Sequence, residues 1–234
     1  MSPDSEEPWT GIFTKRPAAG RVKTRLVPPL GEEAAARLAQ GMLDDSVERL
    51  TAAPGRHVLA FAPEEDEAWF RARYPALALV PQRGAGLGER MASFFETALA
   101  SAPACVMTGS DQPLVSGRRL EEAHTALAHD ADLVLGPDRG GGYYLVGLAR
   151  SAPKELAPLL RALFSEAPMS TPSVFEHTLE TARRLGLRTQ RLSVGLDVDT
   201  DADLEQLELV LRDTPALAEA RHTREALREL GRLA

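Results

Sequence analysis

Carboxylates in two short segments are the first residues whose types and spacing could do chemistry. Asp111 lies in the segment GSDQP, directly after an apolar run, and the later segment DVDTDADL contributes Asp197 and Asp199. Magnesium is usually bound by one or two carboxylates together with the phosphates of a substrate. Asp111 with one of the two later acids would satisfy that pattern. We therefore expect a site for Mg²⁺ or Mn²⁺ formed from these three residues.

The same two segments also have a structural interpretation. Asp111 could instead cap the turn into a helix that begins at Gly117. Thr200 is a suitable N-cap, and Asp201 and Asp203 would then lie in the first turn of the helix that follows. We expect this capping role for Thr200 and its two acids, and a metal role for the three acids named above.

A strongly basic segment, residues 15–31, follows the first apolar run. It is far longer than the usual connection of about two to six residues. Its first eleven residues carry five cations and no acid, in a chain whose net charge is −7. These cations are Lys15, Arg16, Arg21, Lys23 and Arg25. Because a local positive field attracts phosphates, we expect the five cations and Thr24 to bind the phosphates of a nucleotide, with a solvated basic loop as the alternative.

The pair Lys23-Thr24 looks like the end of a P-loop. The motif fails here because Val22 stands where a glycine is required, and no glycine sits at Ala18's end of the motif to begin the phosphate cradle. Side chains, rather than a cradle of backbone amides, would therefore hold phosphate in this segment.

Glycines mark two further segments. In QRGAGLGERM, Gly86 and Gly88 lead into a helix that begins at Leu87, where backbone amides could approach an anion or a base. A plain tight turn is an equal alternative, since the spacing does not match the dinucleotide fingerprint. In GPDRGGGYYLVGL, Gly140, Gly141 and Gly142 precede Tyr143. We find no packing reason for three consecutive glycines, so we expect this backbone and Tyr143 to lie against a substrate.

The sequence lacks the motifs of several other common kinds of catalytic site. The five histidines are scattered, and no HExxH, CxxC or GxSxG segment occurs. Cys105 lies inside an apolar run and is most simply a small core residue.

The scaffold that must position these segments follows from seven short apolar runs that alternate with helical patterns. Such alternation is typical of a mostly parallel sheet wrapped by helices. The runs are residues 10–14, 57–62, 77–81, 104–109, 133–136, 143–148 and 188–194. The glycine-rich and charged segments follow these runs, and open α/β sheets bind ligands at the carboxyl ends of their strands. We predict an α/β fold with a seven-stranded, mostly parallel mixed sheet flanked by helices.

Helical patterns cover several of the intervening segments. Apolar residues in 87–100 recur at helical spacing, and residues 32–52 and 171–186 are also predicted helices, the last with Thr171 as N-cap, Pro172 in its first turn and Gly186 as terminator. We divide the chain into a polar lead-in (1–8), one domain (9–214) and an amphipathic C-terminal helix (215–234). That helix packs either on the flank of the domain or on a second subunit in a homodimer.

Composition bounds the class of protein. The 234 residues are 44% hydrophobic and 26% charged, as in an average folded domain. The net charge of −7 disfavours a nucleic-acid partner, which would require a basic surface. One cysteine excludes an internal disulfide, and no run approaches the ~20 apolar residues of a membrane span. We expect a cytoplasmic protein with no membrane partner.

These motifs together resemble the bacterial DUF2064 family, also labelled arsenosugar-type or rSAM-associated glycosyltransferases. That family lies within the nucleotide-diphospho-sugar transferase (GT-A) superfamily. The resemblance covers residues 11 to about 205 and rests on six ordered segments: FTKRPAAGRVKTRL, GLGERM, GSDQP, GPDRGGGYYLVGL, STPSV and DVDTDADL. It implies a single-domain, Rossmann-like GT-A fold and a transferase that handles nucleotides.

Two relatives in the superfamily extend the resemblance. AGRVKTRL is similar to the triphosphate-holding loop of 2-phospho-L-lactate guanylyltransferases and molybdenum-cofactor nucleotidyltransferases, and GSDQP with DVDT resembles their paired magnesium sites. By that similarity Lys23 and Arg25 grip the phosphates, and Asp111 with Asp199 or Asp197 holds the metal. Sugar transferases of the superfamily more often carry D-x-D where this chain reads Ser-Asp-Gln.

The chain also departs from the family pattern. The family usually reads D-G-G-Y where this chain has Gly140 in place of the acid, and Asp138, two positions earlier, is the candidate substitute for binding substrate. Met169 replaces the family tryptophan, and Asp201 replaces a proline. If the missing acid normally positions a substrate, specificity is shifted or activity is reduced.

Three functions remain open from the sequence. The first is magnesium-dependent nucleotidyl transfer from a nucleoside triphosphate to a small phosphorylated acceptor, with release of pyrophosphate and with Lys23, Arg25 and Asp111 as catalytic residues. The second is glycosyl transfer from a nucleotide-sugar to a small acceptor. The third is a nucleotide-binding module without activity.

Overall fold

The structure is a computed structural model that describes residues 7–152, 154–214 and 220–233. Of the expected lead-in, only residues 7 and 8 lie within these ranges, and residues 215–219 and 234 of the expected terminal helix lie outside them. Among the described helices, none is both long and apolar enough to cross a membrane.

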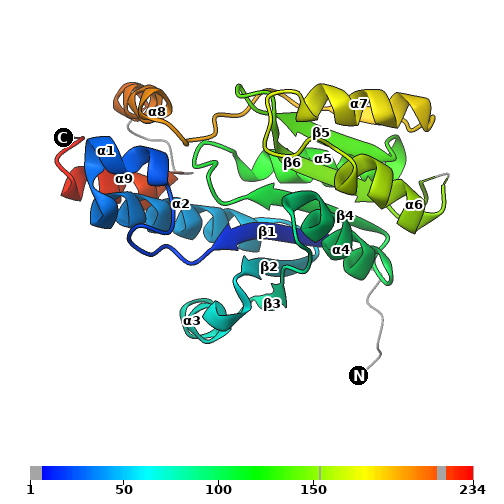
Figure 1. Ribbon diagram of the computed structural model, residues 1–234, viewed down its shortest axis with the longest axis horizontal. Helices are drawn as coiled ribbons and strands as arrows, with labels where there is room; N and C mark the ends of the chain where they lie inside the picture. The colour runs from blue at the N-terminus through cyan, green and yellow to red at the C-terminus, as the bar shows by residue number, and fades with distance from the viewer. Residues whose placement is uncertain (1–6, 153, 215–219, 234) are drawn as a thin grey trace.

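One sheet forms the centre of the described chain (Figure 1). Its strands are β1 (Trp9–Lys15), β2 (Arg56–Ala62), β3 (Ala78–Pro81), β4 (Ala104–Gly109), β5 (Leu133–Pro137), β6 (Tyr143–Ala149) and β7 (Thr189–Arg191). The spatial order is β3-β2-β1-β4-β6-β5-β7. Neighbouring strands are parallel except where β6 pairs with β4 and with β5. The predicted mostly parallel, seven-stranded mixed sheet is therefore confirmed.

The last strand is shorter than predicted. The chain leaves regular pairing after Arg191, although the backbone N–H of Leu192 still donates to Leu135 and that of Gly195 to Pro137. Residues 193–199 then run as an extended segment across the carboxyl ends of the strands, and we call this segment the strap. Val194, which the sequence placed at the end of the last strand, lies on the strap instead and is 55% exposed.

Helices cover both faces of the sheet. Their bounds are α1 (Val27–Leu30), α2 (Glu32–Ala52), α3 (Glu67–Arg73), α4 (Leu87–Leu99), α5 (Gly117–His129), α6 (Leu156–Leu160), α7 (Val174–Arg184), α8 (Asp201–Asp213) and α9 (Arg221–Glu229). Figure 1 shows α4, α6 and α7 on one side of the sheet, with α2 and α5 on the other. The apolar stripe predicted on α4 is confirmed as core for Met91, Phe94, Phe95 and Ala98, which are buried against the strands, but is wrong for Leu87, which is 44% exposed at the start of the helix.

The register of the strands explains why the functional segments meet. β1 pairs in parallel with β4, with Phe13 opposite Gly109, and β5 runs in the same direction because β6 is antiparallel to both β4 and β5. The carboxyl ends of β1, β4 and β5 therefore lie at one edge of the sheet. Asp111 and Asp138 follow the ends of β4 and β5 at that edge.

A group of helices lies beyond this edge. α1, α8, α9 and the first half of α2 share an apolar cluster that includes Leu38, Leu207 and Leu227. A Cβ atom at Gly41 of α2 would lie 2.7 Å from the backbone oxygen of His222, so only glycine lets α9 approach this closely. Of the two arrangements expected for the C-terminal helix, residues 221–229 show packing on the flank of their own domain.

The start of α7 differs from the sequence prediction. The helix begins at Val174 with Ser173 at the N-cap position, rather than with Thr171 and Pro172. The hydroxyl of Thr171 donates to the carbonyl of Pro168 at 2.7 Å, so it closes a preceding turn. The predicted terminator is confirmed, since Gly186 has the left-handed φ of 72°.

Candidate active site

Lys23 lies at the centre of the candidate site. It precedes a short 3-10 turn (Thr24–Leu26) and adopts a left-handed backbone, φ 47° and ψ 42°. A residue with a Cβ atom rarely adopts this conformation, and such strain concentrates at functional sites. The Lys23 side chain is only 4% exposed, and its Nζ lies 3.0 Å from Asp111 Oδ2 and 2.9 Å from Asp199 Oδ1.

Three carboxylates surround this ammonium. Asp111 follows β4, while Asp197 and Asp199 lie on the strap, and one oxygen from each lies within 4.8 Å of the others. We call these three residues with Lys23 the acidic centre. Three carboxylates and one ammonium leave two negative charges in excess when all are ionised. One divalent cation would balance that charge.

Of the three carboxylates in the acidic centre, Asp197 is the one with an oxygen that the protein leaves unsatisfied. Its Oδ1 is buried and has no hydrogen-bond partner among the described residues. Burial raises the pKa of Asp197 to about 7, and the neighbouring carboxylates add to this effect while Lys23 opposes it. A buried polar atom without a partner is costly. The oxygen-only donor set and this orphaned atom both fit a hard divalent cation such as Mg²⁺ or Mn²⁺.

Lys23 and Asp199 stabilise each other's charges. Burial by itself lowers the pKa of the Lys23 ammonium, but the carboxylates around it outweigh that effect and raise the pKa above its usual value. Burial likewise tends to raise the pKa of Asp199, but the ammonium of Lys23 and its hydrogen bond outweigh burial and lower it. The pair is therefore ionised at neutral pH.

Backbone and amide hydrogen bonds hold the strap against the loop after β4. The N–H of Val198 donates to the carbonyl oxygen of Asp111 at 3.2 Å. The Gln112 amide, oriented to satisfy both partners, donates to the carbonyl of Leu196 at 2.9 Å and accepts from the N–H of Asp197 at 3.3 Å. Candidate metal ligands from two distant parts of the sequence are thereby joined directly.

The start of α8 fixes the other end of the strap. The Thr200 side chain accepts from the N–H of Asp203, and Asp203 Oδ2 accepts from the N–H of Thr200 at 2.8 Å, which forms a capping box. The same oxygen accepts from the N–H of Asp199 at 3.2 Å. The predicted capping role of Thr200 and Asp203 is confirmed, and Asp201 lies exposed in the first turn.

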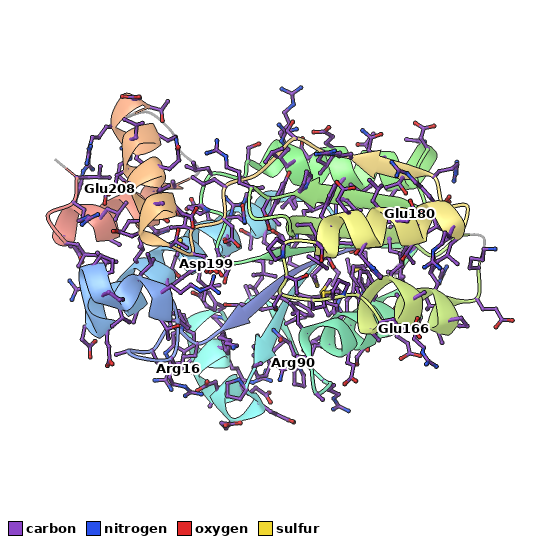
Figure 2. All side chains as sticks on the ribbon, turned by 45° about the horizontal axis from the view of Figure 1, so that its top comes forward. Arg16, Arg90, Glu166, Glu180, Asp199 and Glu208 are labelled. Atoms are coloured by element: carbon purple, nitrogen blue, oxygen red, sulfur yellow. The ribbon has the colours of Figure 1, made fainter. Side chains whose placement is uncertain are left out.

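The other predicted cations divide into two groups. Arg25 lies at the rim of the acidic centre, 72% exposed, with Nη1 3.7 Å from Asp199 Oδ2. Arg16 and Arg21 instead approach Asp66, at 3.4 and 3.8 Å. Figure 2 shows Arg16 toward α3, apart from Asp199. The structure thus joins Lys23 and Arg25 to the acids, whereas a phosphate contact from Arg16 or Arg21 stays a prediction.

The positions of Lys15 and Thr24 do not connect either residue to the acidic centre. Lys15 ends β1 and is exposed, without an ion pair among the described residues. Thr24 begins the 3-10 turn that follows Lys23. Their roles in phosphate binding also stay predictions.

The glycines before α4 have different surroundings. A Cβ atom at Gly86 would meet nothing within 4 Å, so this backbone is open to a ligand. A Cβ atom at Gly88 would lie 2.1 Å from the carbonyl oxygen of Phe164. Close packing of α4 on the turn Arg161–Ser165 is therefore enough to require Gly88, and nucleotide binding by either glycine stays a prediction.

The expectation that packing does not account for the glycine triplet is wrong. A Cβ atom at Gly141 would lie 2.0 Å from the carbonyl oxygen of Pro172, and one at Gly142 would lie 2.5 Å from Asp138 Oδ2. Asp138 Oδ1 accepts from the N–H groups of Gly140 at 2.7 Å and Gly142 at 2.9 Å. The triplet folds tightly around Asp138, and Gly140 has the least crowded position.

Tyr143 is also engaged within the protein. Its hydroxyl lies 3.6 Å from the sulfur of Met169, and its side chain packs against the main core cluster. Contact of Tyr143 or of the 138–142 turn with a substrate stays a prediction.

Two residues at the site were not identified from the sequence. Gln112 joins the strap to the loop after β4, and its position beside Asp111 in GSDQP was a usable signal. Asp66, which pairs with Arg16 and Arg21, ends the 3-10 turn Glu64–Asp66 directly before α3, and no local pattern marks it.

Comparisons with known proteins identify the family and agree with the fold. The family described as "Uncharacterized protein conserved in bacteria (DUF2064)" matches residues 46–171, more than half of the chain. A protein of Desulfovibrio desulfuricans G20 assigned to the nucleotide-diphospho-sugar transferases has a similar crystal structure. Its TM-score is 0.85 at 27% identity, over 97% of this chain and 96% of that one. No protein of curated function matches the chain in sequence.

More distant structures share the fold. A CMP:2-keto-3-deoxy-manno-octonic acid synthetase in complex with CTP has a TM-score of 0.55 at 14% identity, over 88% of this chain and 99% of that one. The manganese complex of Rv0371c from Mycobacterium tuberculosis H37Rv has a TM-score of 0.51 at 15% identity, over 86% and 97%. At these identities the likeness concerns the fold alone.

Proposed function

The chain belongs to the DUF2064 family, and from that membership and the acidic centre we propose that it is a nucleotidyltransferase dependent on Mg²⁺ or Mn²⁺. The donor is a nucleoside triphosphate and the acceptor a small phosphorylated molecule. An oxygen of the acceptor phosphate bonds to the α-phosphorus, the bond from that phosphorus to the bridging oxygen breaks, and pyrophosphate leaves with the electron pair. The observation that carries the proposal is the convergence of Asp111, Asp197, Asp199 and a buried Lys23.

The three carboxylates would hold the metal. When bound, a divalent ion neutralises charge on phosphate oxygens and orients them for in-line displacement. Asp197 contributes the oxygen that has no partner among the described residues. Gln112, the neighbour of Asp111, binds the strap at one end, and Asp203 in the capping box of α8 binds the N–H of Asp199 at the other. The spacing of Asp111 and Asp199 therefore depends on both.

Lys23 and Arg25 act on the phosphates from the protein side. The Lys23 ammonium has three N–H donors and uses two of them on Asp111 and Asp199, which leaves one for a phosphate oxygen. Arg25 is exposed at the rim and only distantly paired with Asp199, so its planar guanidinium is free to bind pyrophosphate oxygens in a bidentate manner. No side chain has to remove a proton, because the attacking phosphate is already an anion.

The comparisons support this class of reaction. The similar protein of Desulfovibrio desulfuricans is assigned to the transferases, and the synthetase of like fold binds CTP. The manganese complex of Rv0371c supports a divalent ion in this fold.

Glycosyl transfer from a nucleotide-sugar is the second candidate. The assignment of the Desulfovibrio protein to the nucleotide-diphospho-sugar transferases favours it. The same acidic centre would hold the diphosphate of the donor, and a nucleoside diphosphate would leave in place of pyrophosphate.

The products separate the two candidates. The protein is incubated with Mg²⁺, each nucleoside triphosphate and a panel of sugar phosphates and phosphorylated hydroxy acids. We expect pyrophosphate release and a product whose mass equals the acceptor plus a nucleoside monophosphate less one water, both abolished by EDTA. Thermal shift first selects the donor, since the preferred nucleotide raises the melting temperature by mass action. Release of a nucleoside diphosphate from nucleotide-sugars would favour the second candidate, and stabilisation without any product would overturn both.

A further inference from the structure

A second cavity lies beside the strap, outside the acidic centre. Its volume is about 290 Å³, near the lower end of the range of about 300 to 1,000 Å³ typical of small-molecule sites. Its walls come from the loop before α5, the first turn of α5, the middle of the strap and one face of α8. Lys23 and the three carboxylates of the acidic centre are not among its lining residues.

The charge of this cavity is one-sided. Its lining includes the guanidinium groups of Arg119 and Arg139 and no carboxylate, although the chain as a whole carries a net charge of −7. Arg119 makes one ion pair, from Nη1 to Glu122 Oε2 at 2.8 Å, which leaves its other N–H groups available. Arg139 is exposed and has no ion pair or hydrogen bond from its side chain within the described ranges. An acid-free hollow with a free guanidinium favours an anionic ligand.

The rest of the wall combines aliphatic side chains with polar ones such as Ser116 and Gln206. Leu114, Val115, Val194, Leu196 and Val210 line it. Val194 is one of the few large apolar side chains that remain exposed, at 55%. This exposed valine offers a ligand an apolar contact beside the two arginines. The lining therefore suits a small organic anion with a short aliphatic part.

Tyr144 gives the cavity a fixed wall. A Cβ atom at Gly136 would lie 2.6 Å from its ring and one at Gly195 would lie 2.5 Å from it, so two glycines make room for the ring. The Tyr144 hydroxyl donates to the carbonyl of Ser193 at 3.2 Å. The ring is locked between the sheet and the strap, so the cavity is preformed rather than a gap between loose loops.

We propose that this cavity binds a small organic anion, with its phosphate or carboxylate group between Arg119 and Arg139 and its aliphatic part against Val194 and Leu196. The site is distinct from the acidic centre and does not depend on the nucleotidyltransferase proposal. It lies close to that centre along the chain, because Leu196 immediately precedes Asp197.

Calorimetric titration of the metal-free full chain tests the proposal. The probes are isobutyl phosphate, 3-methylbutyrate and the neutral 3-methylbutanol, so that the two anion arms distinguish phosphate from carboxylate. We expect saturable one-to-one binding of at least one anion at millimolar concentration and none of the alcohol. R139A is expected to raise Kd about tenfold, the scale of one lost charge-assisted hydrogen bond, and R139K to recover part of the loss.

Arg118 supplies the matched control. It is an exposed arginine on the same helix turn as Arg119 and does not line this cavity, so R118A is expected to change Kd less than twofold. Melting temperatures establish that each variant is folded. The proposal is overturned if neither anion binds saturably, if the alcohol binds as well as the anions, or if R139A leaves Kd unchanged. It is also overturned if K23A, rather than R139A, removes binding, because the anion would then lie in the acidic centre.

Discussion

Two groups of three metal-capable side chains occur in the described structure, and they differ in how their oxygens are satisfied. In the group of Asp45, Glu48 and His222, Asp45 accepts from the backbone N–H groups of His222 and Thr223, each at 2.8 Å, and from the Thr223 hydroxyl at 2.6 Å. In the acidic centre, Asp197 Oδ1 has no donor within the described residues. Proximity of acids alone is therefore a weak sign of a metal site, whereas an unsatisfied buried oxygen is a stronger one.

The role of Asp45 follows from its donors. It caps the first turn of α9, where backbone N–H groups have no partner within the helix. Glu48 makes exposed ion pairs to Arg221 and His222, at 3.2 and 3.4 Å. This group attaches the C-terminal helix to α2, whereas the acidic centre is the proposed site of the reaction.

The largest expected effect is a loss of activity when a carboxylate of the acidic centre is replaced. D111A should lower metal-dependent turnover by about 10²- to 10³-fold, because it removes a preorganised group from the charged reaction centre. The measurement is the rate of pyrophosphate release, with circular dichroism to establish folding. D201N is the matched control, since Asp201 lies exposed on the same short segment as Asp199 and outside the centre. Full turnover by D111A would remove the metal assignment.

The second prediction concerns the Asp45 group, where we expect a substitution to change stability rather than activity. D45A should lower the free energy of unfolding by about 2 to 3 kcal/mol, because a buried cap is lost and its donors are left unpaired. Urea unfolding measures the change. E48A should cost no more than about 1 kcal/mol, since Glu48 is exposed. Loss of Mn²⁺ binding in D45A with unchanged stability would show that the two groups had been assigned the wrong way round.

The third prediction concerns pH. Burial raises the pKa of Asp197 to about 7 in the metal-free protein, so a proton competes with a cation below that pH. Affinity for Mn²⁺ without nucleotide should therefore fall by up to about tenfold for each pH unit below neutrality, and level off above it. Titration calorimetry over that range measures this dependence. D197N should bind Mn²⁺ more weakly and lose most of the pH dependence. A wild-type affinity that rises with acidity would contradict the placement of Asp197 as a ligand.

The smallest expected effect concerns the ammonium within the acidic centre. Lys23 shares Asp111 and Asp199 with the proposed cation, so K23A should raise the affinity for Mn²⁺ without nucleotide by about fivefold or less, the scale of one partly exposed ion pair. Turnover should nevertheless fall, because Lys23 also donates to phosphate. R25A serves as the control, since Arg25 is largely exposed and should leave Mn²⁺ affinity nearly unchanged. Parallel losses of metal affinity and turnover in K23A would sink this assignment.

Local patterns predicted much of the fold. The seven apolar runs, the stripe on α4 apart from Leu87 and the capping box at Thr200 each depend on neighbours a few residues apart, and the structure confirms them. The predicted N-terminus of α7 was wrong because the Thr171 hydroxyl donates to the carbonyl of Pro168 and so closes a turn before the helix. The local sequence does not show which of the two structures, turn or helix cap, Thr171 forms.

The site was predictable in its residue types and less so in its contacts. The three acids were grouped because the carboxyl ends of the strands meet at one edge. The approach of Lys23 to Asp199 spans 176 positions of sequence and depends on a left-handed backbone that no local rule assigns to lysine. The crowding of Gly141 by Pro172 is likewise a tertiary contact, and without it the glycine triplet was interpreted as a substrate surface.

The reversed direction of β6 has one more consequence. Because β5 and β6 form an antiparallel pair, the chain reverses direction at the functional edge through the short turn 138–142, without a crossover helix. Within that hairpin tip, Arg139 and Gly140 are exposed and can change size or charge while the strands stay in register, whereas Gly141 and Gly142 have no room for a side chain. Those two positions are therefore where we expect the specificity of the proposed site to change without rebuilding the sheet.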